Sequence, residues 1–141
     1  RRALIAKTTV AGKELCVVSG HFSWWKSDFK SEWHRLEKAL VAEATPLVIM
    51  GDFNNPENTP GHELVLASPL GLKDSHLAAK KVTGGPTILQ DIDGWENNDK
   101  ALRIDFIFVS QQLEVKESHV LFDGKKSPLI SDHFGVECVI E

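Results

Sequence analysis

The 141 residues suit a single domain, and 42% of them are hydrophobic, which is enough to build a core. The net charge of -4 argues against a surface that binds nucleic-acid backbone, because such surfaces depend on clustered Lys and Arg. Every apolar stretch is shorter than the run of about 20 residues that crosses a bilayer, and no signal-peptide core follows Arg1. Cys16 and Cys138 stand in apolar runs, as reduced core cysteines do. The sequence therefore predicts a cytoplasmic protein that binds neither nucleic acid nor a membrane.

The first part of the chain alternates strand and helix patterns. Strands are predicted at about 3–10 and 14–20, joined by a tight turn. Apolar residues then recur at helical spacing, which predicts a helix from a Ser27 cap to about Ala44. The residues on its apolar face, expected to pack on a sheet, are Phe29, Trp33, Leu36 and Leu40. An unbroken apolar run at 47–50 predicts a strand that is covered on both faces.

The second part adds a short helix, a long loop and three strands. Thr59 and Pro60 predict the start of a helix that runs to about Ala67. Residues 82–100 are rich in Gly, Asn and Asp, and they predict a long loop of the kind that is often functional. The remaining strands are predicted at 103–109, 115–122 and 135–140. The order of elements indicates a mixed α/β fold without repeats.

Three segments that are far apart in the chain each place an acidic residue beside a short apolar run. They are Gly51-Asp52-Phe53-Asn54, Arg103-Ile104-Asp105-Phe106-Ile107-Phe108 and Ser131-Asp132-His133-Phe134-Gly135-Val136. Burial of an unpaired carboxylate is costly, so we expect these charges to gather around a metal or a histidine. Asp105 has two interpretations, a structural ion pair with Arg103 or a lysine, and a carboxylate that orients a histidine. The neighbours Asp132 and His133 either contact a cation and a substrate or form an ordinary polar turn.

Asp52 and Asn54 stand two residues apart at a predicted strand end. They could hold an attacking water and a phosphoryl oxygen, since those tasks need one acceptor and one donor. His21, at another predicted strand end, could donate to a phosphoryl oxygen or protonate a leaving group. Each of these signals is weak alone, because a lone histidine at such a place is more often structural. Together with the other acidic segments they predict a phosphoesterase site.

In order and spacing, His21 and the three acidic segments resemble the carboxyl half of the endonuclease/exonuclease/phosphatase superfamily, over about residues 3–141. The resemblance implies a four-layer α/β sandwich of the DNase I-like type, with two β-sheets packed face to face and an active site at one end of the sheets. It implies that residues 1–141 are the carboxyl-terminal half of one such domain, because the asparagine and the main metal-binding glutamate of the family's early strands have no candidate here. The chain also begins without Met inside an apparent strand, so we expect it to be a fragment.

The resemblance also implies what each residue does. Asp52 would orient or deprotonate the water, and Asn54 would bind the phosphoryl group. Asp105 would pair with His133, which would contact the phosphate, and His21 would contact the phosphate as well. These five residues are the predicted catalytic group.

A hard divalent cation is the expected cofactor, because it prefers oxygen ligands and neutralises charge on phosphoryl oxygens. The resemblance implies Mg²⁺, with Mn²⁺ as the alternative, and it implies Asp132 and Asp52 as ligands. Without the missing glutamate, the chain as printed is expected to bind metal poorly and to be inactive.

The segment His21-Phe22-Ser23-Trp24-Trp25 resembles bacterial members of the superfamily that include maltose 6'-phosphate phosphatase. Trp24 and Trp25 could therefore stack on a sugar ring, although we expect one of the two to anchor the following helix in the core. Trp95, in the polar loop, could line the entrance to the substrate site or hold the loop in place. The predicted function is phosphate release from a small phosphorylated sugar. The alternatives are a nuclease or other phosphodiesterase of the superfamily, and an inactive binding module.

Overall fold

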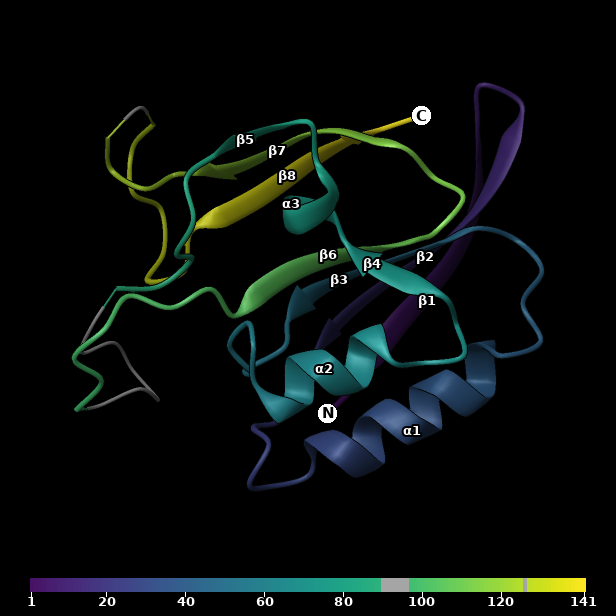
Figure 1. Ribbon diagram of the computed structural model, residues 1–141, viewed down its shortest axis with the longest axis horizontal. Helices are drawn as coiled ribbons and strands as arrows, with labels where there is room; N and C mark the ends of the chain where they lie inside the picture. The colour runs from purple at the N-terminus through teal and green to yellow at the C-terminus, as the bar shows by residue number, and fades with distance from the viewer. Residues whose placement is uncertain (90–96, 126) are drawn as a thin grey trace.

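The computed structural model describes residues 1–89, 97–125 and 127–141 of the chain (Figure 1). In chain order the elements of these residues are β1 (Ala3–Val10), β2 (Lys13–His21), α1 (Phe29–Leu40), β3 (Leu47–Asp52), α2 (Pro60–Leu66), β4 (Leu72–Asp74), α3 (Ser75–Ala78), β5 (Lys81–Thr83), β6 (Asp105–Ser110), β7 (Val115–Leu121) and β8 (Gly135–Ile140). They form a five-stranded sheet in the order β1-β2-β3-β6-β4 and a three-stranded sheet in the order β5-β7-β8. No helix of the described part is both long and apolar enough to cross a membrane.

Two apolar cores hold the layers together. One lies between the five-stranded sheet and the helices α1 and α2, and the other lies between the two sheets (Figure 1). The alternation of side chains along β6 serves both cores, since Phe106 and Phe108 enter the first while Ile107 and Val109 enter the second. The described residues thus form a helical layer and two face-to-face sheets of the predicted mixed α/β sandwich.

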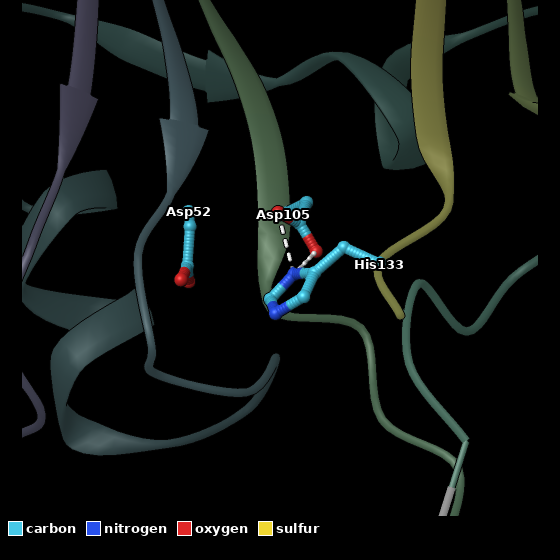
Figure 2. Close-up of side chains that lie close together, drawn as sticks. All are labelled: Asp52, Asp105 and His133. Atoms are coloured by element: carbon cyan, nitrogen blue, oxygen red, sulfur yellow. Dashed lines mark hydrogen bonds and ion pairs between the residues drawn. The ribbon is translucent and has the colours of Figure 1, made fainter. Parts of the chain in front are cut away.

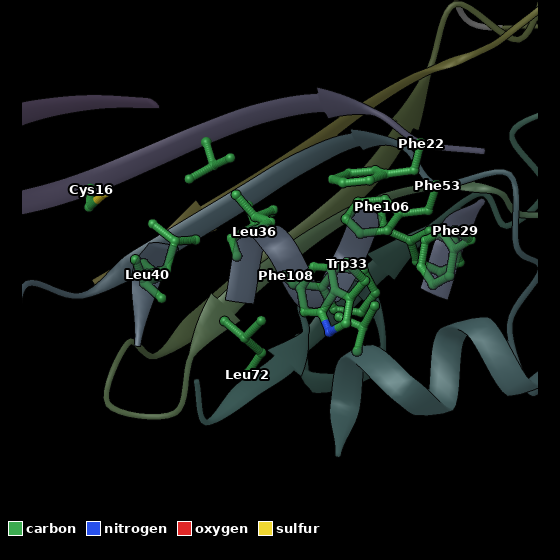
Figure 3. Packing of buried hydrophobic residues seen from close by; sticks show 14 residues of the cluster. Cys16, Phe22, Phe29, Trp33, Leu36, Leu40, Phe53, Leu72, Phe106 and Phe108 are labelled. Atoms are coloured by element: carbon green, nitrogen blue, oxygen red, sulfur yellow. The ribbon is translucent and has the colours of Figure 1, made fainter. Parts of the chain in front are cut away.

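The predicted apolar face of α1 is confirmed. Phe29, Trp33, Leu36 and Leu40 are all buried. Figure 3 shows Phe29 and Trp33 among the phenylalanines of the cluster and Leu40 toward the end at which Cys16 lies. The ends of the helix differ from the prediction, because Asp28 rather than Ser27 precedes it and the helix stops at Leu40 rather than at Ala44. Beyond Leu40 the side chain of Glu43 accepts a hydrogen bond from the backbone of Thr45 at 3.1 Å, and this local bond competes with a further helical turn.

Three short elements were not predicted from the sequence, namely β4, α3 and β5. They contain 3, 4 and 3 residues, which is too short for either the helical or the strand period to show. Their pairing partners fix them instead, with β4 on the edge of β6 and β5 parallel to β7. The predicted loop at 82–100 therefore begins in a strand.

A buried ion-pair network lies at the β4 edge of the five-stranded sheet. Arg103 donates to both carboxylate oxygens of Asp74, at 3.1 and 2.8 Å, and to Glu57 Oε2 at 2.6 Å. The Nε2 atom of His62 lies 3.0 Å from Asp74 Oδ2, and the Arg103 guanidinium lies 4.5 Å from the centre of the Phe106 ring. The two hydrogen bonds to one carboxylate fix the start of β6 against β4.

This network predicts that the protein loses stability in acid. Burial alone would raise the pKa of Asp74, but hydrogen bonds from His62 and Arg103 and the charge of Arg103 hold it below its ordinary value of 3.8. A carboxyl whose folded pKa is lowered contributes stability that is complete above its unfolded pKa and is lost as the pH falls through the folded pKa. We expect Asp74→Asn to lower the free energy of unfolding by about 2 kcal/mol at pH 7, and this difference from the wild type to shrink below pH 3.8.

Urea unfolding of the complete protein at neutral and acid pH would measure this effect. Asp28→Asn is the matched control, because Asp28 is exposed and its side chain makes no capping hydrogen bond. A difference between the wild type and Asp74→Asn that stays the same at both pH values would contradict the prediction.

Candidate active site

The strands β2 and β3 end, and the neighbouring strand β6 begins, at predicted site residues that lie in a row. β2 and β3 are parallel with His21 opposite Asp52, and β3 and β6 are antiparallel with Asp52 opposite Asp105. Residues opposite one another on neighbouring strands point to the same face of the sheet. Met50 and Ile107 point into the core between the sheets. Asp52 and Asp105 lie two residues further along the same faces of their strands, so they stand at one end of that core.

Glycine allows the ends of β2 and β3 to approach closely. Gly51 has φ +136°, and a Cβ atom built on it would lie 1.8 Å from the carbonyl oxygen of Gly20 on the neighbouring strand. No L side chain fits at this place without moving the backbone. The close approach brings the next residues of the two strands together, so that His21 Nε2 lies 3.2 Å from Asp52 Oδ2.

Asn54 links these residues to the loop that follows β2. Its backbone N–H donates to Asp52 Oδ1 at 2.8 Å, and its side-chain Nδ2 lies 3.0 Å from Asp52 Oδ2 and 3.2 Å from His21 Nε2. Nδ2 also donates to the carbonyl of Phe22 at 3.0 Å, while the indole N–H of Trp24 donates to Asn54 Oδ1. Asn54 is only 7% exposed, and these contacts hold its amide between the carboxylate and the imidazole.

His133 reaches the same site from the segment that precedes β8. Its Nδ1 atom lies 2.9 Å from Asp105 Oδ2 and 3.2 Å from Asp105 Oδ1, and Figure 2 shows the ring held beside the carboxylate with Asp52 on the neighbouring strand. The hydrogen bond fixes the orientation of the imidazole and leaves Nε2 to meet a substrate. Arg103 pairs with Asp74 instead, so the structural interpretation of Asp105 as its ion-pair partner is wrong.

Thr87 supports this pair, and it is a residue that sequence reasoning missed. It is fully buried, and its hydroxyl accepts hydrogen bonds from the backbone N–H groups of Ile104 and Asp105, each at 3.1 Å. Its carbonyl oxygen accepts a bond from the N–H of Phe134 at 2.7 Å. Thr87 thus fixes the backbone beside both Asp105 and His133. The only sequence signal was a Thr-Ile pair after Pro86 in a loop rich in Gly, Asn and Asp.

The charges of the site act on one another. Burial raises the pKa of Asp52, and the charge of Asp105 raises it further. Burial also raises the pKa of Asp105, although hydrogen bonds with Thr87 and His133 act in the opposite direction. Burial alone would lower the pKa of His133, but its hydrogen bond with Asp105 and the charges of the nearby carboxylates raise it. Each of the three groups therefore holds a proton more readily in the folded protein than in water, and the ionised form of the two carboxylates is the less favoured one.

The same residues fit a divalent cation. One ligand atom from each of Asp52, Asp105 and His133 lies within 4.8 Å of the others, and the two aspartates stand opposite each other on neighbouring strands (Figure 2). Carboxylate oxygens are the ligands that Mg²⁺ and Mn²⁺ prefer. A cation would also favour the ionised carboxylates, which burial disfavours. The donor set thus suits the predicted cofactor, with Asp52 as an oxygen ligand, while both oxygens of Asp105 lie against His133 Nδ1.

Comparison with known proteins identifies the family. The sequence profile of the endonuclease/exonuclease/phosphatase family matches residues 2–133, which is most of the chain. The chain belongs to the endonuclease/exonuclease/phosphatase family. No curated protein matches it.

Solved structures of this family share the fold. A family protein from Leptotrichia buccalis is 31% identical with a TM-score of 0.82, and the match covers 100% of this chain and 54% of that protein. One from Bacteroides vulgatus is 27% identical with a TM-score of 0.77, over 99% of this chain and 54% of that protein. A mannosyl-6-phosphatase from Bacteroides thetaiotaomicron, 22% identical over 93% of this chain and 52% of its own, has a TM-score of 0.67. The chain thus spans about half the length of the solved structures that it matches.

The structure gathers most of the residues that the family resemblance pointed to, but not all. His21, Asp52 and Asn54 contact one another, and the Asp105–His133 pair lies beside them, with ligand atoms within 4.8 Å of Asp52. Asp132 does not join them, because its side chain is exposed and accepts a hydrogen bond from the Ser131 hydroxyl at 2.9 Å. Its predicted role as a metal ligand has no support in this geometry. Trp95 lies outside the described residues.

The two tryptophans after His21 are both at the surface. Trp24 is 44% exposed and Trp25 is 38% exposed, so the expectation that one of them anchors α1 in the core is wrong. Phe22, Phe29 and Trp33 fill that part of the core instead, with ring centres about 6 Å apart. Both tryptophans are therefore available to a ligand beside Asn54.

The position of Thr87 leads to a prediction for the complete protein. Thr87→Val keeps the shape of the side chain but leaves two buried N–H groups without an acceptor, and this costs about 1–3 kcal/mol of stability. We expect the turnover of a phosphoester also to fall about tenfold, because Asp105 loses its backbone support. Urea unfolding and phosphate release measure the two effects. Thr87→Ser restores the hydroxyl and should restore both, and a fully active Thr87→Val would refute the supporting role.

Proposed function

We propose that the complete protein is a metal-dependent phosphoester hydrolase that releases phosphate from a small sugar phosphate such as maltose 6'-phosphate. The observation that carries the proposal is the convergence of Asp52, Asn54, His21 and the Asp105–His133 pair at one end of the sheets. Exposed tryptophans stand immediately beside this group. Exposed aromatic rings beside a hydrolytic site of this family suit a small phosphorylated carbohydrate, because a sugar ring can stack on them.

Asp52 is the group that would activate the water. Its carboxylate is half-buried, and burial and the charge of Asp105 raise its pKa, which makes the carboxylate a stronger base. Asn54 holds both of its oxygens in place. Asp52 would orient the water in line with the ester bond and accept its proton.

His133 and His21 would hold the phosphoryl group. The bond between His133 Nδ1 and Asp105 leaves Nε2 as the donor to a phosphoryl oxygen, and the raised pKa of His133 favours the protonated ring that can donate. His21 lies across the row on the far side of Asp52, where it could donate to another oxygen or to the leaving group. A bound Mg²⁺ or Mn²⁺ supplies neutralisation of charge on the phosphoryl oxygens.

The charge of the chain favours a small substrate over nucleic acid. The net charge is -4, and Lys26 is the only cationic residue among the described residues that line the pocket beside Asn54. A groove for a nucleic-acid strand would need several Lys or Arg side chains along the backbone. The same catalytic residues could nevertheless cleave a diester, so a nuclease is the alternative that the experiment must distinguish.

Phosphate release by the complete protein tests the proposal. The substrates are phosphorylated disaccharides, hexose phosphates and a supercoiled plasmid, each with Mg²⁺, with Mn²⁺ or with EDTA. We expect metal-dependent release of phosphate from a sugar phosphate and an intact plasmid. Nicked plasmid without free phosphate would mean a nuclease, and no product with any substrate would support a binding module.

A further inference from the structure

A pocket lies next to the candidate active site and shares Asn54 with it. Its volume is about 510 Å³, and the residues that matter for its chemistry are Trp24, Trp25, Asn54, Thr59, Pro60 and Asn98. Small-molecule sites measure about 300–1,000 Å³ and combine apolar walls with a few polar groups. Because Asn54 belongs to both places, a ligand in this pocket would sit directly beside the reacting phosphate.

The aromatic wall of the pocket is held in a fixed position. The indole N–H of Trp24 donates to Asn54 Oδ1, which ties this ring to the catalytic group. The ring of Trp25 lies 6.5 Å from that of Phe29, the first residue of α1, with a tilt of 47°. Phe29 is fully buried, so Trp25 rests on the core while 38% of its own surface faces outward. Two large rings exposed together in a pocket indicate a surface built for a ligand.

Polar groups lie at the rim of this wall. The Thr59 hydroxyl donates to the carbonyl of Pro56 at 2.6 Å, so its oxygen can still accept a hydrogen bond. The amide of Asn98 bonds to the backbone of Lys100 and has a second N–H that can donate. A pyranose ring has faces made of C–H groups, which pack on an aromatic ring, and an edge of hydroxyl groups, which need such partners. The bases of a nucleic acid also stack on aromatic rings, but binding of the phosphate backbone calls for more cations than Lys26, the single one in this lining. The lining therefore matches a sugar best.

We propose that this pocket binds a pyranose ring of the substrate, with Trp25 as the stacking platform and Thr59 and Asn98 as partners of the sugar hydroxyls. The proposal rests on the proposed function in one respect, since it takes the sugar to be the leaving group of the phosphoester. It assigns the choice of substrate to residues that are separate from those that cleave the bond. The affinity for the sugar itself then needs neither the phosphate nor the metal.

Calorimetry of sugar binding tests this subsite without any turnover. The complete protein in EDTA is titrated with maltose, and with adenosine as the competing aromatic ligand. We expect maltose to bind the wild type, Trp25→Ala to weaken this binding about tenfold or more, and Trp25→Phe to retain most of it. Leu77→Ala is the control, because Leu77 is exposed on α3 and outside the pocket lining. Adenosine binding in place of maltose, or equal maltose binding by Trp25→Ala, would overturn the proposal.

Kinetics separate this inference from the proposed function. The ratio of kcat/KM for maltose 6'-phosphate to kcat/KM for ethyl phosphate should fall about tenfold or more in Trp25→Ala, because only the first substrate carries a sugar. If maltose binds in EDTA but no sugar phosphate is hydrolysed, the subsite stands and the proposed function fails. If phosphate is released but the ratio is unchanged in Trp25→Ala, the proposed function stands and the subsite fails.

Discussion

Replacement of Asp52 by Asn is expected to lower phosphate release by the complete protein about 10³-fold. Asn has nearly the same shape as Asp but cannot accept a proton from water. The carboxylate of Asp52 now accepts hydrogen bonds from the backbone and the side chain of Asn54, and the amide oxygen of Asn can keep one of them. The variant would therefore remove the proposed base while it preserves most of the local geometry.

The fold of this variant should survive, and the physical reason lies in the same carboxylate. Burial and the charge of Asp105 raise the pKa of Asp52, which means that the folded protein disfavours its ionised form. A neutral side chain avoids the cost of burying this charge beside Asp105, which offsets the lost hydrogen bond. We therefore expect the free energy of unfolding to change by less than about 1 kcal/mol.

Steady-state phosphate release with Mg²⁺ and urea unfolding together measure the outcome. Asp28→Asn is the control for the chemical change, because Asp28 is exposed and its side chain does not cap α1. Its turnover should equal that of the wild type. Near-normal turnover by Asp52→Asn would refute the assignment of Asp52 as the base.

Local periodicity predicted the parts of the fold that are long enough to display it. The apolar face of α1 and the alternation along β6 could be predicted because burial on one face repeats over several residues. β4, α3 and β5 contain too few residues to repeat, and they depend on strands that lie far away in the sequence. The pairing of Arg103 with Asp74, 29 residues away, likewise has no local signal.

The candidate site was predicted largely from the order of its motifs, and its misses have physical causes. Asp132 and His133 lie in a bend that precedes β8, where His133 contacts Asp105 while Asp132 is exposed, and strand alternation does not predict the directions of side chains in a bend. Thr87 acts through its backbone and a buried hydroxyl, neither of which differs in sequence from an ordinary loop threonine. The tryptophans were misjudged because the spacing of α1 does not reveal that Phe22 already fills the core beside it.

Loss of either member of the Asp105–His133 pair is expected to lower phosphate release about 10²-fold, and loss of both should cost little more. Under the proposed function, His133 would donate to the phosphate only with its ring correctly oriented, and Asp105 holds that orientation through the bond to Nδ1 at 2.9 Å. Each single variant, Asp105→Asn or His133→Gln, therefore removes the same donor. The test is a double-mutant cycle on kcat/KM of the complete protein with Mg²⁺.

A second histidine–carboxylate pair of the same length provides the control for this cycle. His119 Nε2 lies 2.9 Å from Glu117 Oε2 on β7, a strand of the other sheet. Glu117→Gln removes the charge that pairs with His119 and with Lys81, and it should leave turnover unchanged, because the proposed function gives His119 no role. If the effects of Asp105→Asn and His133→Gln multiply to about 10⁴-fold in the double variant, the two residues act independently. Asp105 would then have a role of its own, and the carboxylate that faces Asp52 across β3 and β6 would act as a ligand of the cation in preference to orienting the histidine.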